Sequence, residues 1–570
     1  MMHQRFSKPQ TTAFRKVRDQ LRVLSGGQLE RDYFDLAYPR FLISRRTYQS
    51  ELRFMDMSLR SRLGEWVCNP SFMSNGNAFI VLNLVASPNS ELKSAEAVRE
   101  IYGQGRNTQK SSGYAPHPYF PALFNTHNCI DKEMHGRKRR IVSQGFSTAT
   151  INSSEPMIIN HVQNLCNALT KSIPEPQGLS DYGWSPPQDM AAWTNYLTLD
   201  VIPDLTYGQP FRLLTSPDVR WRVNAIVSGN CRIYLRFAFP ALFNINPSAW
   251  YSPDKWIFPE MAAERQRFLE ISTKYSEERR ASEEKMSRRN DIMSALLAAK
   301  DPKTGTKLPE AEVWGEAHLM IAAGGDTTST ALAPVLFYLL RSDAAHARLN
   351  DEIRGTFHSV ESIRQDPLLN SCNYLRACLE EAMRLAPPAP GALWREVCAG
   401  GAIVDREQIP AGYDVAVCQY AICHNADYFP EPYEFKPERF IASPSKGESR
   451  DDYFTYVTAS TRSPCLYPST LSPGISTPLP LTPGGTEKPP TFAPFLIGPR
   501  SCVAKPFAYL EMSLAIARLV WLMDFRAADS TGEGRPGCGL AGRERKEEFQ
   551  MWICLVARRR DRFYNGEEGR

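Results

Sequence analysis

The strongest constraint on the fold is the segment that follows Pro309, EAEVWGEAHLMIAAGGDTTSTALAPVLFYLL. Proline is tolerated in the first turn of a helix, and a helix over residues 310–340 would be about 45 Å long, enough to cross a whole domain. The segment is apolar on nearly every side, which indicates a buried helix. We therefore expect a buried helix that crosses a whole domain.

The middle of this segment holds a cluster that a buried helix does not favour, Gly324-Gly325-Asp326-Thr327-Thr328. Glycine costs about 1 kcal/mol in a helix interior, and a buried carboxylate costs more unless it is paired. A carboxylate next to a hydroxyl in an apolar helix is instead typical of a proton relay. We interpret the cluster as functional rather than stabilising.

Composition and charge exclude several classes of protein. The 570 residues are 42% hydrophobic and 23% charged, which is typical of a globular chain and not of a collagen, a coiled coil or a disordered protein. With 67 basic and 62 acidic residues the net charge is +5, so no nucleic-acid or acidic partner is indicated. The 13 cysteines are sparse and irregularly spaced, which favours free thiols in a reducing compartment.

The flanking segments are weakly patterned. Residues 1–80 show no regular element, and the apolar run at residues 78–86 is far shorter than the roughly 20 residues that cross a bilayer. The first residues are basic and lack a signal-peptide core, so a solvated arm and a transit peptide are both open. Residues 258–300 read as one long charged helix. The eight prolines within residues 460–491 indicate an exposed insert at about 445–491.

A second functional segment lies at residues 495–523, FLIGPRSCVAKPFAYLEMSLAIARLVWLM. A Gly-Pro turn precedes Cys502, and a strong helical pattern with Pro506 in its first turn follows it. The N-terminus of a helix and the nearby Arg500 both favour the thiolate, which is the form that ligates a metal. Cys502 is therefore the candidate metal ligand, and the other cysteines are interpreted as buried thiols.

This segment resembles the haem-binding loop of the cytochrome P450 family, whose pattern is Phe-x-x-Gly-x-Arg-x-Cys-x-Gly. Phe495, Gly498, Arg500 and Cys502 match the pattern, and Ala504 replaces the last glycine with another small residue. The resemblance implies that Cys502 is the axial ligand of haem b and that the other four residues bind the cofactor.

Two further motifs follow the same family in the same order. Residues 323–328 resemble the oxygen-binding kink of its long central helix. Glu381 and Arg384 resemble its Glu-x-x-Arg pair, whose spacing places both side chains on one helix face, and Arg439 in Pro-Glu-Arg-Phe supplies the third partner. The resemblance implies a Glu381–Arg384–Arg439 network that holds the backbone on the proximal side of the haem.

Two basic segments resemble the family's contacts with the haem propionates. His135 and Arg139, in DKEMHGRKRRIV, are similar to an aromatic-x-x-x-Arg pattern with histidine at the aromatic position. Arg395, in ALWREV, resembles a further propionate contact. The alternative for His135 and Arg139 is a solvated basic face.

The resemblance implies a mainly α cytochrome P450 fold with a small β part over residues 81–570. Thr327 would hydrogen-bond to O2 and Asp326 would help to relay protons. Electrons would come from NADPH through a separate flavoprotein reductase, because no Gly-x-Gly-x-x-Gly fingerprint follows a strand. The basic residues expected either to dock this partner or to form a solvated face are Arg137, Lys138 and Arg140.

The substrate site is expected to be apolar and to accept a lipophilic molecule. The positions expected to face the substrate, with a packing role as the alternative for each, are Leu319, Ala323, Ala389 and Leu393.

The function that we expect is that of a fungal-type monooxygenase, a monomer that oxidises a terpenoid, polyketide or alkaloid in secondary-metabolite biosynthesis. One alternative is a reductase-independent haem-thiolate isomerase or dehydratase, against which the presence of both Asp326 and Thr327 argues. Another is an inactive haem-binding protein. The resemblance also implies the cytosolic face of the endoplasmic reticulum membrane, although the sequence contains no transmembrane segment.

Overall fold

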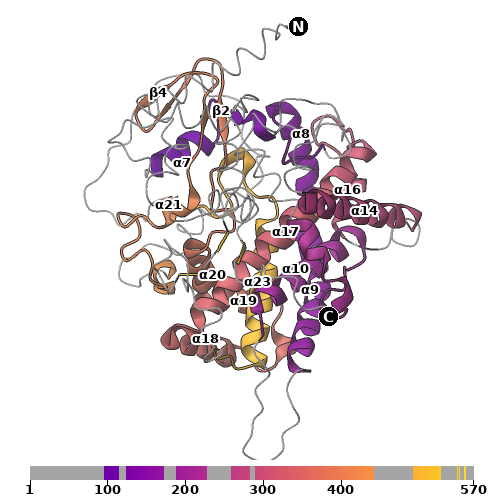
Figure 1. Ribbon diagram of the computed structural model, residues 1–570, viewed down its shortest axis with the longest axis vertical. Helices are drawn as coiled ribbons and strands as arrows, with labels where there is room; N and C mark the ends of the chain where they lie inside the picture. Colours follow the sequence, from indigo (N-terminus) through magenta and orange to yellow (C-terminus); the bar gives the residue numbers. More distant parts are fainter. Residues whose placement is uncertain are drawn as a thin grey trace, which may run out of the picture.

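The fold is mainly α-helical with a small β part, as the sequence predicted (Figure 1). The computed structural model describes residues 95–114, 124–171, 188–227, 259–282, 289, 291–441, 492–527, 548–549, 551–552 and 558–559. The predicted N-terminal segment 1–80 and the predicted insert 445–491 lie outside these residues. None of the helices within them is both long enough and apolar enough to span a bilayer.

The α-helices are α7 (Ala95–Tyr102), α8 (Lys132–Val142), α9 (Thr148–Thr170), α10 (Met190–Tyr207), α14 (Pro259–Ala281), α16 (Ile292–Ala298), α17 (Glu310–Leu339), α18 (Asp343–Thr356), α19 (Pro367–Ser371), α20 (Asn373–Leu385), α21 (Gln419–Cys423) and α23 (Lys505–Leu522). The strands are β1 (Thr108–Lys110), β2 (Arg395–Val397), β3 (Ala402–Val404), β4 (Glu407–Ile409), β5 (Asp414–Val415), β6 (Met551–Trp552) and β7 (Arg558–Arg559).

Helix α17 is the central element, and it runs obliquely through the helical part of the molecule (Figure 1). It packs against α10, α20, α23 and α16, which accounts for its nearly continuous apolar sequence. The helix continues without interruption through the Gly-Gly-Asp-Thr-Thr cluster. The sequence correctly placed this helix, and its Pro309 stands at the N-cap.

The two glycines of the cluster have a packing role, which corrects the interpretation of the cluster as purely functional. A Cβ atom at Gly325 would lie 2.1 Å from Cδ2 of Leu199, and one at Gly324 would lie 2.9 Å from Cδ1 of Ile202. Both contacts come from α10, and Thr198 of α10 donates a hydrogen bond of 2.7 Å to the Gly325 carbonyl oxygen. The glycines therefore let α10 lie directly against α17.

We expect Gly325→Ala to lower the free energy of unfolding by about 1–3 kcal/mol, because overpacking of a close contact outweighs the gain in helix propensity. Gly355→Ala in α18 is the matched control, since a Cβ there would meet no atom within 4 Å, and it should stabilise by up to about 1 kcal/mol. Urea unfolding of both variants measures the difference. Equal stabilisation by the two substitutions would contradict the packing role of Gly325.

The main sheet has the strand order β1-β2-β5, and both pairings are antiparallel. Its register places Lys110 of β1 directly opposite Arg395 of β2. Like charges at directly opposed positions destabilise a sheet. This pairing therefore calls for a compensating negative charge nearby. The other strands form two hairpins, β3–β4 and β6–β7.

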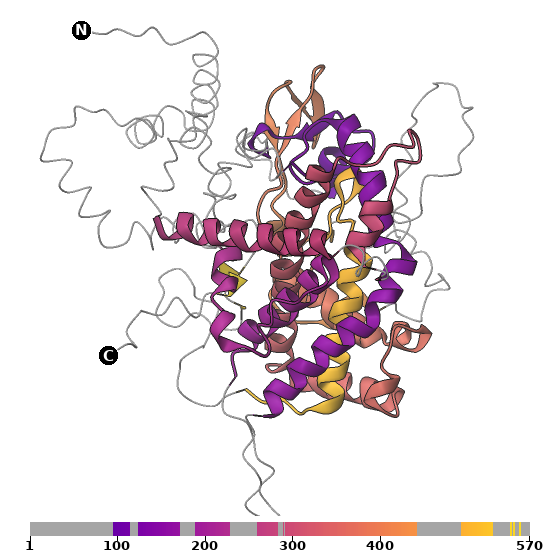
Figure 2. The same ribbon diagram turned by 90° about the vertical axis from the view of Figure 1, so that its right-hand side faces the viewer.

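The sequence predicted one helix over the charged segment 258–300, but the described residues of this segment form two separate helices, α14 and α16. Helix α14 ends at Ala281 and extends sideways from the body of the protein (Figure 2). Helix α16 begins after Asp291, whose side chain caps it by accepting a hydrogen bond from the Ser294 backbone N–H. Arg279 of α14 donates to the same Asp291 oxygen at 3.0 Å, so this carboxylate joins the two helices.

Candidate active site

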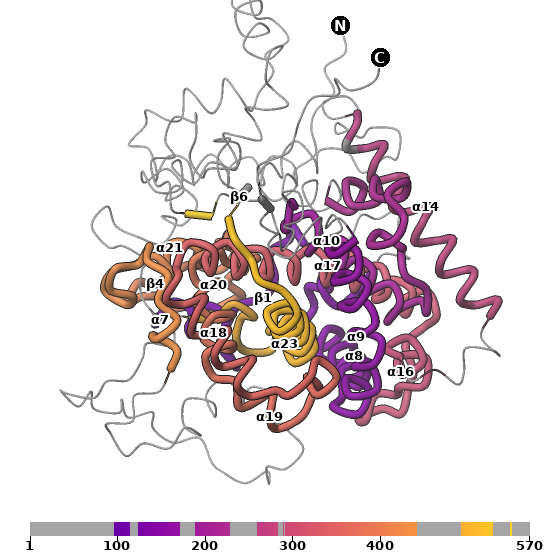
Figure 3. The backbone as a smooth tube through the Cα atoms, turned by 90° about the horizontal axis from the view of Figure 1, so that it is seen from below, coloured from indigo at the N-terminus to yellow at the C-terminus, as the bar shows by residue number. Residues whose placement is uncertain are grey.

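The loop before α23 is closed by its own backbone. The Cys502 N–H donates to the Phe495 carbonyl oxygen at 2.8 Å, and the Phe495 ring packs against Tyr509 of α23 with 5.0 Å between ring centroids. Gly498 has φ +70°, and a Cβ there would lie 2.1 Å from the Tyr102 carbonyl oxygen. Only glycine fits at this position. Helix α23 itself contacts α9, α18 and α20 (Figure 3), so the loop stands on a packed core.

The side chain of Cys502 is exposed, whereas the other described cysteines are buried or half-buried. Desolvation by the surrounding protein raises the pKa of its thiol, and the backbone N–H of Ala504 and the charge of Arg139 oppose this only in part. The sequence predicted that the helix N-terminus and Arg500 would favour the thiolate. The net effect is a pKa above the ordinary value of a thiol, and a bound metal ion would favour the thiolate.

Four cationic side chains lie beside this loop, and each donates to a backbone carbonyl oxygen. Arg500 donates to the carbonyl oxygens of Cys129 and Ile130, at 2.5 and 2.8 Å. Arg139 donates to that of Ser501 at 2.5 Å, and Arg395 to that of Trp394 at 2.9 Å. Lys110 donates to that of His127. Within the described part of the chain, none of the four lies at ion-pair distance from a carboxylate. We call Lys110, Arg139, Arg395 and Arg500 the cation cluster.

Burial and mutual repulsion act together on this cluster. They lower the pKa of Arg500 to about 10 and that of Lys110 well below its usual value. Burial, followed by the charges of the cluster, lowers the pKa of His135 to about 3, which makes its imidazole neutral at pH 7. Partly buried cations without a counter-ion are costly. The cluster is therefore suited to an anion that carries more than one negative charge.

One side of α17 carries the residues expected to face O2 and substrate. Ala323 is exposed, while Leu319 and Thr327 are half-buried, and the Thr327 hydroxyl donates to the Ala323 carbonyl oxygen at 2.6 Å. Asp326 is buried. It lies on the same side of α17 as Ser329, whose hydroxyl donates a hydrogen bond to the Asn195 side chain of α10. The two relay residues are thus adjacent in sequence but point to different sides of the helix.

The remaining two positions expected to face the substrate lie between α20 and β2. Ala389 and Leu393 are both half-buried. The Leu393 carbonyl oxygen accepts a hydrogen bond from Arg395 at 3.1 Å. This segment is therefore attached to the cation cluster.

The structure brings Glu381, Arg384 and Arg439 together. Both Glu381 and Arg384 are completely buried, and Arg384 donates to the two Glu381 oxygens at 2.7 and 2.9 Å. Arg439 donates to Glu381 at 3.2 Å. The other Arg384 donors reach carbonyl oxygens of residues 423, 432 and 434, so this one guanidinium fastens α20 to a distant loop.

Comparison with known proteins decides the family. The sequence profile described as Cytochrome P450 matches residues 78–534. The chain belongs to the cytochrome P450 family. Among curated relatives, a cytochrome P450 monooxygenase of Gibberella zeae is 34% identical over 471 residues, covering 80% of this chain and 94% of the relative. The cytochrome P450 monooxygenase apf7 of Gibberella fujikuroi is 34% identical over 460 residues, covering 78% and 79%.

Solved structures agree on the fold of this cytochrome P450. The haem domain of cytochrome P450DA superposes with a TM-score of 0.57 at 16% identity, covering 82% of this chain and 85% of that one. The cytochrome P450 CYP102L1 gives 0.55 at 19% identity, covering 82% and 90%. The predicted cytochrome P450 fold is thereby confirmed.

The cation cluster and the exposed Cys502 fit the haem that the family uses. Haem carries two propionate carboxylates, which the cation cluster would hold, and an iron ion, which the Cys502 sulfur would hold. The sequence analysis did not identify Lys110 or His127 as part of this site. The centre of the His127 ring lies 5.3 Å from the centre of the Tyr114 ring. No local motif marks Lys110, because only the long-range pairing of β1 with β2 brings it to Arg395.

Two of the basic residues proposed to dock a reductase are engaged inside this cytochrome P450. Lys138 is completely buried and pairs with Glu312 at 2.7 Å. Arg140 donates to both oxygens of Asp301, at 2.7 and 2.9 Å. The complete burial of Lys138 rules out both a docking role and a solvated role for that residue, whereas the Arg140 side chain stays 33% exposed while paired with Asp301. A charge-rich helix sequence does not reveal which cations have partners on other elements.

Helix α23 also contains a buried carboxyl group, that of Glu511, which the sequence analysis did not single out. Its side chain is completely buried, and neither carboxyl oxygen has a hydrogen-bond donor within the described residues. Burial alone raises its pKa from 4.5 to about 8. The carboxyl is therefore mostly protonated in the folded protein at neutral pH and ionised in the unfolded chain.

We expect this difference to make stability fall as pH rises from about 4.5 to 8, because only the unfolded state releases the proton there. Glu511→Gln should remove this contribution and raise the free energy of unfolding at pH 8 by about 2–4 kcal/mol. Glu277→Gln on the exposed face of α14 is the control and should leave the pH profile unchanged. Urea unfolding at pH 5, 6.5 and 8 measures the effect, and parallel profiles for wild type and Glu511→Gln would contradict it.

Proposed function

We propose that this cytochrome P450 is a haem-thiolate monooxygenase that uses O2 and electrons from a separate reductase to hydroxylate or otherwise oxidise a lipophilic natural product. The observation that carries the proposal is the exposed Cys502 next to a cation cluster without described counter-ions. Haem, when bound through Cys502, supplies the activation of O2. NADPH would provide the electrons through a flavoprotein.

Each part of the site has a defined task in this proposal. The cation cluster and the neutral His135 bind the propionates, while Phe495, Gly498 and Ala504 shape the loop that presents Cys502. The Glu381–Arg384–Arg439 network holds the proximal backbone. All of these residues serve to bind the cofactor, whereas the residues proposed to take part in the reaction itself lie on α17.

Thr327 and Asp326 are proposed to manage protons. The Thr327 hydroxyl donates a hydrogen bond to the Ala323 carbonyl oxygen, so its oxygen can accept a hydrogen bond from a water molecule. The hydroxyl can donate to another group once the side chain rotates. Asp326, buried behind it, supplies the proton-exchanging group of the relay. The apolar neighbours Leu319 and Ala323 keep this side of α17 suited to a lipophilic substrate.

The substrate class is proposed as a terpenoid, polyketide or alkaloid of secondary metabolism. The apolar side chains expected at the substrate, Leu319, Ala323, Ala389 and Leu393, support a lipophilic ligand. The curated relatives are named cytochrome P450 monooxygenases and come from fungi. We propose that the enzyme acts as a monomer, without nucleic acid, at the cytosolic face of the endoplasmic reticulum membrane.

The test is reconstitution with NADPH, a cytochrome P450 reductase and a panel of such substrates under 18O2. The expected result is one labelled oxygen per product and NADPH oxidation matched to product. In the same assay Thr327→Ala should keep oxidising NADPH while peroxide replaces product. Turnover without NADPH and without label would instead support an isomerase or dehydratase. Haem binding without turnover of any substrate would support an inactive binding protein.

A further inference from the structure

The segment 124–130, which we call the 124–130 turn, connects the site to the start of α8. Its carbonyl oxygens at Cys129 and Ile130 hold Arg500, and its carbonyl oxygen at His127 holds Lys110. Two of the four members of the cation cluster therefore depend on where this turn lies. Its interior is braced by Asn125 and Asn128, whose side chains each accept the backbone N–H of the other residue, at 3.1 and 2.8 Å.

A buried carboxylate of α17 holds this turn in place. Glu316 is completely buried, and its Oε1 accepts hydrogen bonds from both the backbone N–H and the hydroxyl of Thr126, each at 2.7 Å. The Lys138 ammonium of α8 lies 3.6 Å from the same oxygen. The other oxygen, Oε2, has no hydrogen-bond partner within the described residues, so the bonds at Oε1 are what offsets the cost of burying this carboxyl group. We call Glu316, Thr126 and Lys138 the clasp.

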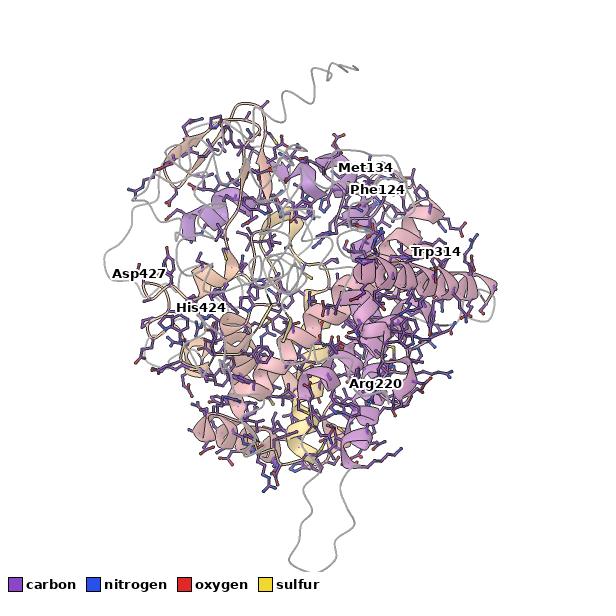
Figure 4. The ribbon with its side chains drawn as sticks, in the orientation of Figure 1. Phe124, Met134, Arg220, Trp314, His424 and Asp427 are labelled. Carbon is purple, nitrogen blue, oxygen red and sulfur yellow. The ribbon has the colours of Figure 1, made fainter. Side chains whose placement is uncertain are left out.

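Lys138 extends the clasp to the beginning of the turn. Its ammonium donates to the Phe124 carbonyl oxygen at 3.4 Å and lies 4.3 Å from the centre of the Phe124 ring. Figure 4 shows Phe124 beside α8, near Met134. Lys138 also pairs with Glu312, one turn before Glu316 on α17. The turn is thus bonded to α17 through Thr126 and to α8 through Phe124.

The position of Glu316 on α17 relates the clasp to the active side of that helix. Ala323 and Thr327 follow it by seven and eleven residues. At 3.6 residues per turn both lie within about 20° of its direction around the helix. Helix α17 therefore carries the proposed proton relay and also, three turns away, fixes the 124–130 turn on which the cation cluster depends.

We propose that Glu316, Thr126 and Lys138 form a positioning site that fixes the 124–130 turn against α17 and so holds Arg500 and Lys110 at the spacing required to bind the two carboxylates of haem. The clasp does not touch the cofactor in this proposal, and its residues are positioning residues. The inference rests on the proposed function, because it takes haem as the anion that the cluster binds.

The experiment measures the rate at which the haem-loaded full-length protein releases haem to excess apomyoglobin, together with its melting temperature. Thr126→Val removes one hydrogen bond to Glu316 and keeps the shape of the side chain. We expect release to be about tenfold faster, as befits a hydrogen bond to a charged group. Thr126→Ser keeps the hydroxyl and should restore the wild-type rate. Glu316→Gln keeps an acceptor oxygen but loses the charge facing Lys138, so its rate should lie between the two.

Arg140→Met is the matched control. Arg140 lies on the same helix as Lys138 and forms a bidentate ion pair with Asp301, but it makes no described contact with the 124–130 turn. It should lower the melting temperature without changing the rate of haem release. This separates positioning of the cluster from general loosening of α8.

The outcomes distinguish the inference from the proposed function. Wild-type release rates in Thr126→Val and Glu316→Gln would overturn the inference and leave the haem-thiolate assignment intact. Faster release in Arg140→Met equal to that in Thr126→Val would also overturn it, because the effect would then be one of stability. A wild-type protein that takes up no haem, or shows no thiolate spectrum with carbon monoxide, would instead remove the proposed function on which the inference rests.

Discussion

Replacing Cys502 by alanine is expected to abolish the red-shifted Soret band of the reduced carbon monoxide complex, and with it all monooxygenase turnover. Cys502 is the exposed thiol of the described residues, and its backbone N–H is fixed by the bond to Phe495. Because desolvation raises the pKa of the free thiol, ligation to iron is what would keep this sulfur deprotonated. Without the sulfur, the loop retains its shape but offers no ligand.

The control for Cys502→Ala is Cys398→Ala, which removes a half-buried thiol at the edge of the small β part. It should leave the spectrum and the turnover unchanged. The two variants are compared by the absorption spectrum after reduction under carbon monoxide, at equal haem content. A persistent thiolate band in Cys502→Ala, or its loss in Cys398→Ala, would show that another sulfur binds the iron.

The parts of the structure that could be predicted from sequence are those written in short, local patterns. The length and apolarity of 310–340 predicted α17, and a ten-residue loop pattern singled out Cys502, whose role as the iron ligand stays a prediction. Glu381 and Arg384 lie one helical turn apart, so a shared helix face followed from spacing alone. In each case the relevant neighbours are close in sequence.

The parts that escaped prediction depend on contacts between distant segments. Gly325 is required by the side chain of Leu199 on another helix, which no local pattern reveals. Lys138 reads as a surface cation in a basic helix, yet its partner Glu312 comes from α17. Lys110 lies opposite Arg395 only because strands β1 and β2 pair. The Gly-Gly-Asp-Thr-Thr cluster inside the apolar helix was taken as a sign of chemistry, although contacts with α10 explain its two glycines by packing.

Arg384→Ala is expected to destroy haem incorporation and most of the folded stability. Its guanidinium makes five hydrogen bonds, two to Glu381 and three to backbone carbonyl oxygens, so every donor nitrogen is used. Removing it leaves the completely buried Glu381 with only Arg439 and the Lys436 backbone N–H as partners. Breaking a buried pair costs about 3–5 kcal/mol, a large share of the roughly 5–15 kcal/mol that stabilises a domain.

Two further variants test whether the geometry of the Arg384 guanidinium, and not its charge alone, is required. Arg384→Lys keeps the positive charge but cannot reproduce the planar fork, so we expect it to fail nearly as badly as alanine. Arg348→Ala removes an ion pair to Glu438 that is more than half exposed, which is worth about 0–1 kcal/mol, and haem content should remain normal. The readouts are the ratio of haem to protein and urea unfolding of the purified variants. Full haem content in Arg384→Lys would mean that charge alone suffices, and the geometric role of the guanidinium would have to be abandoned.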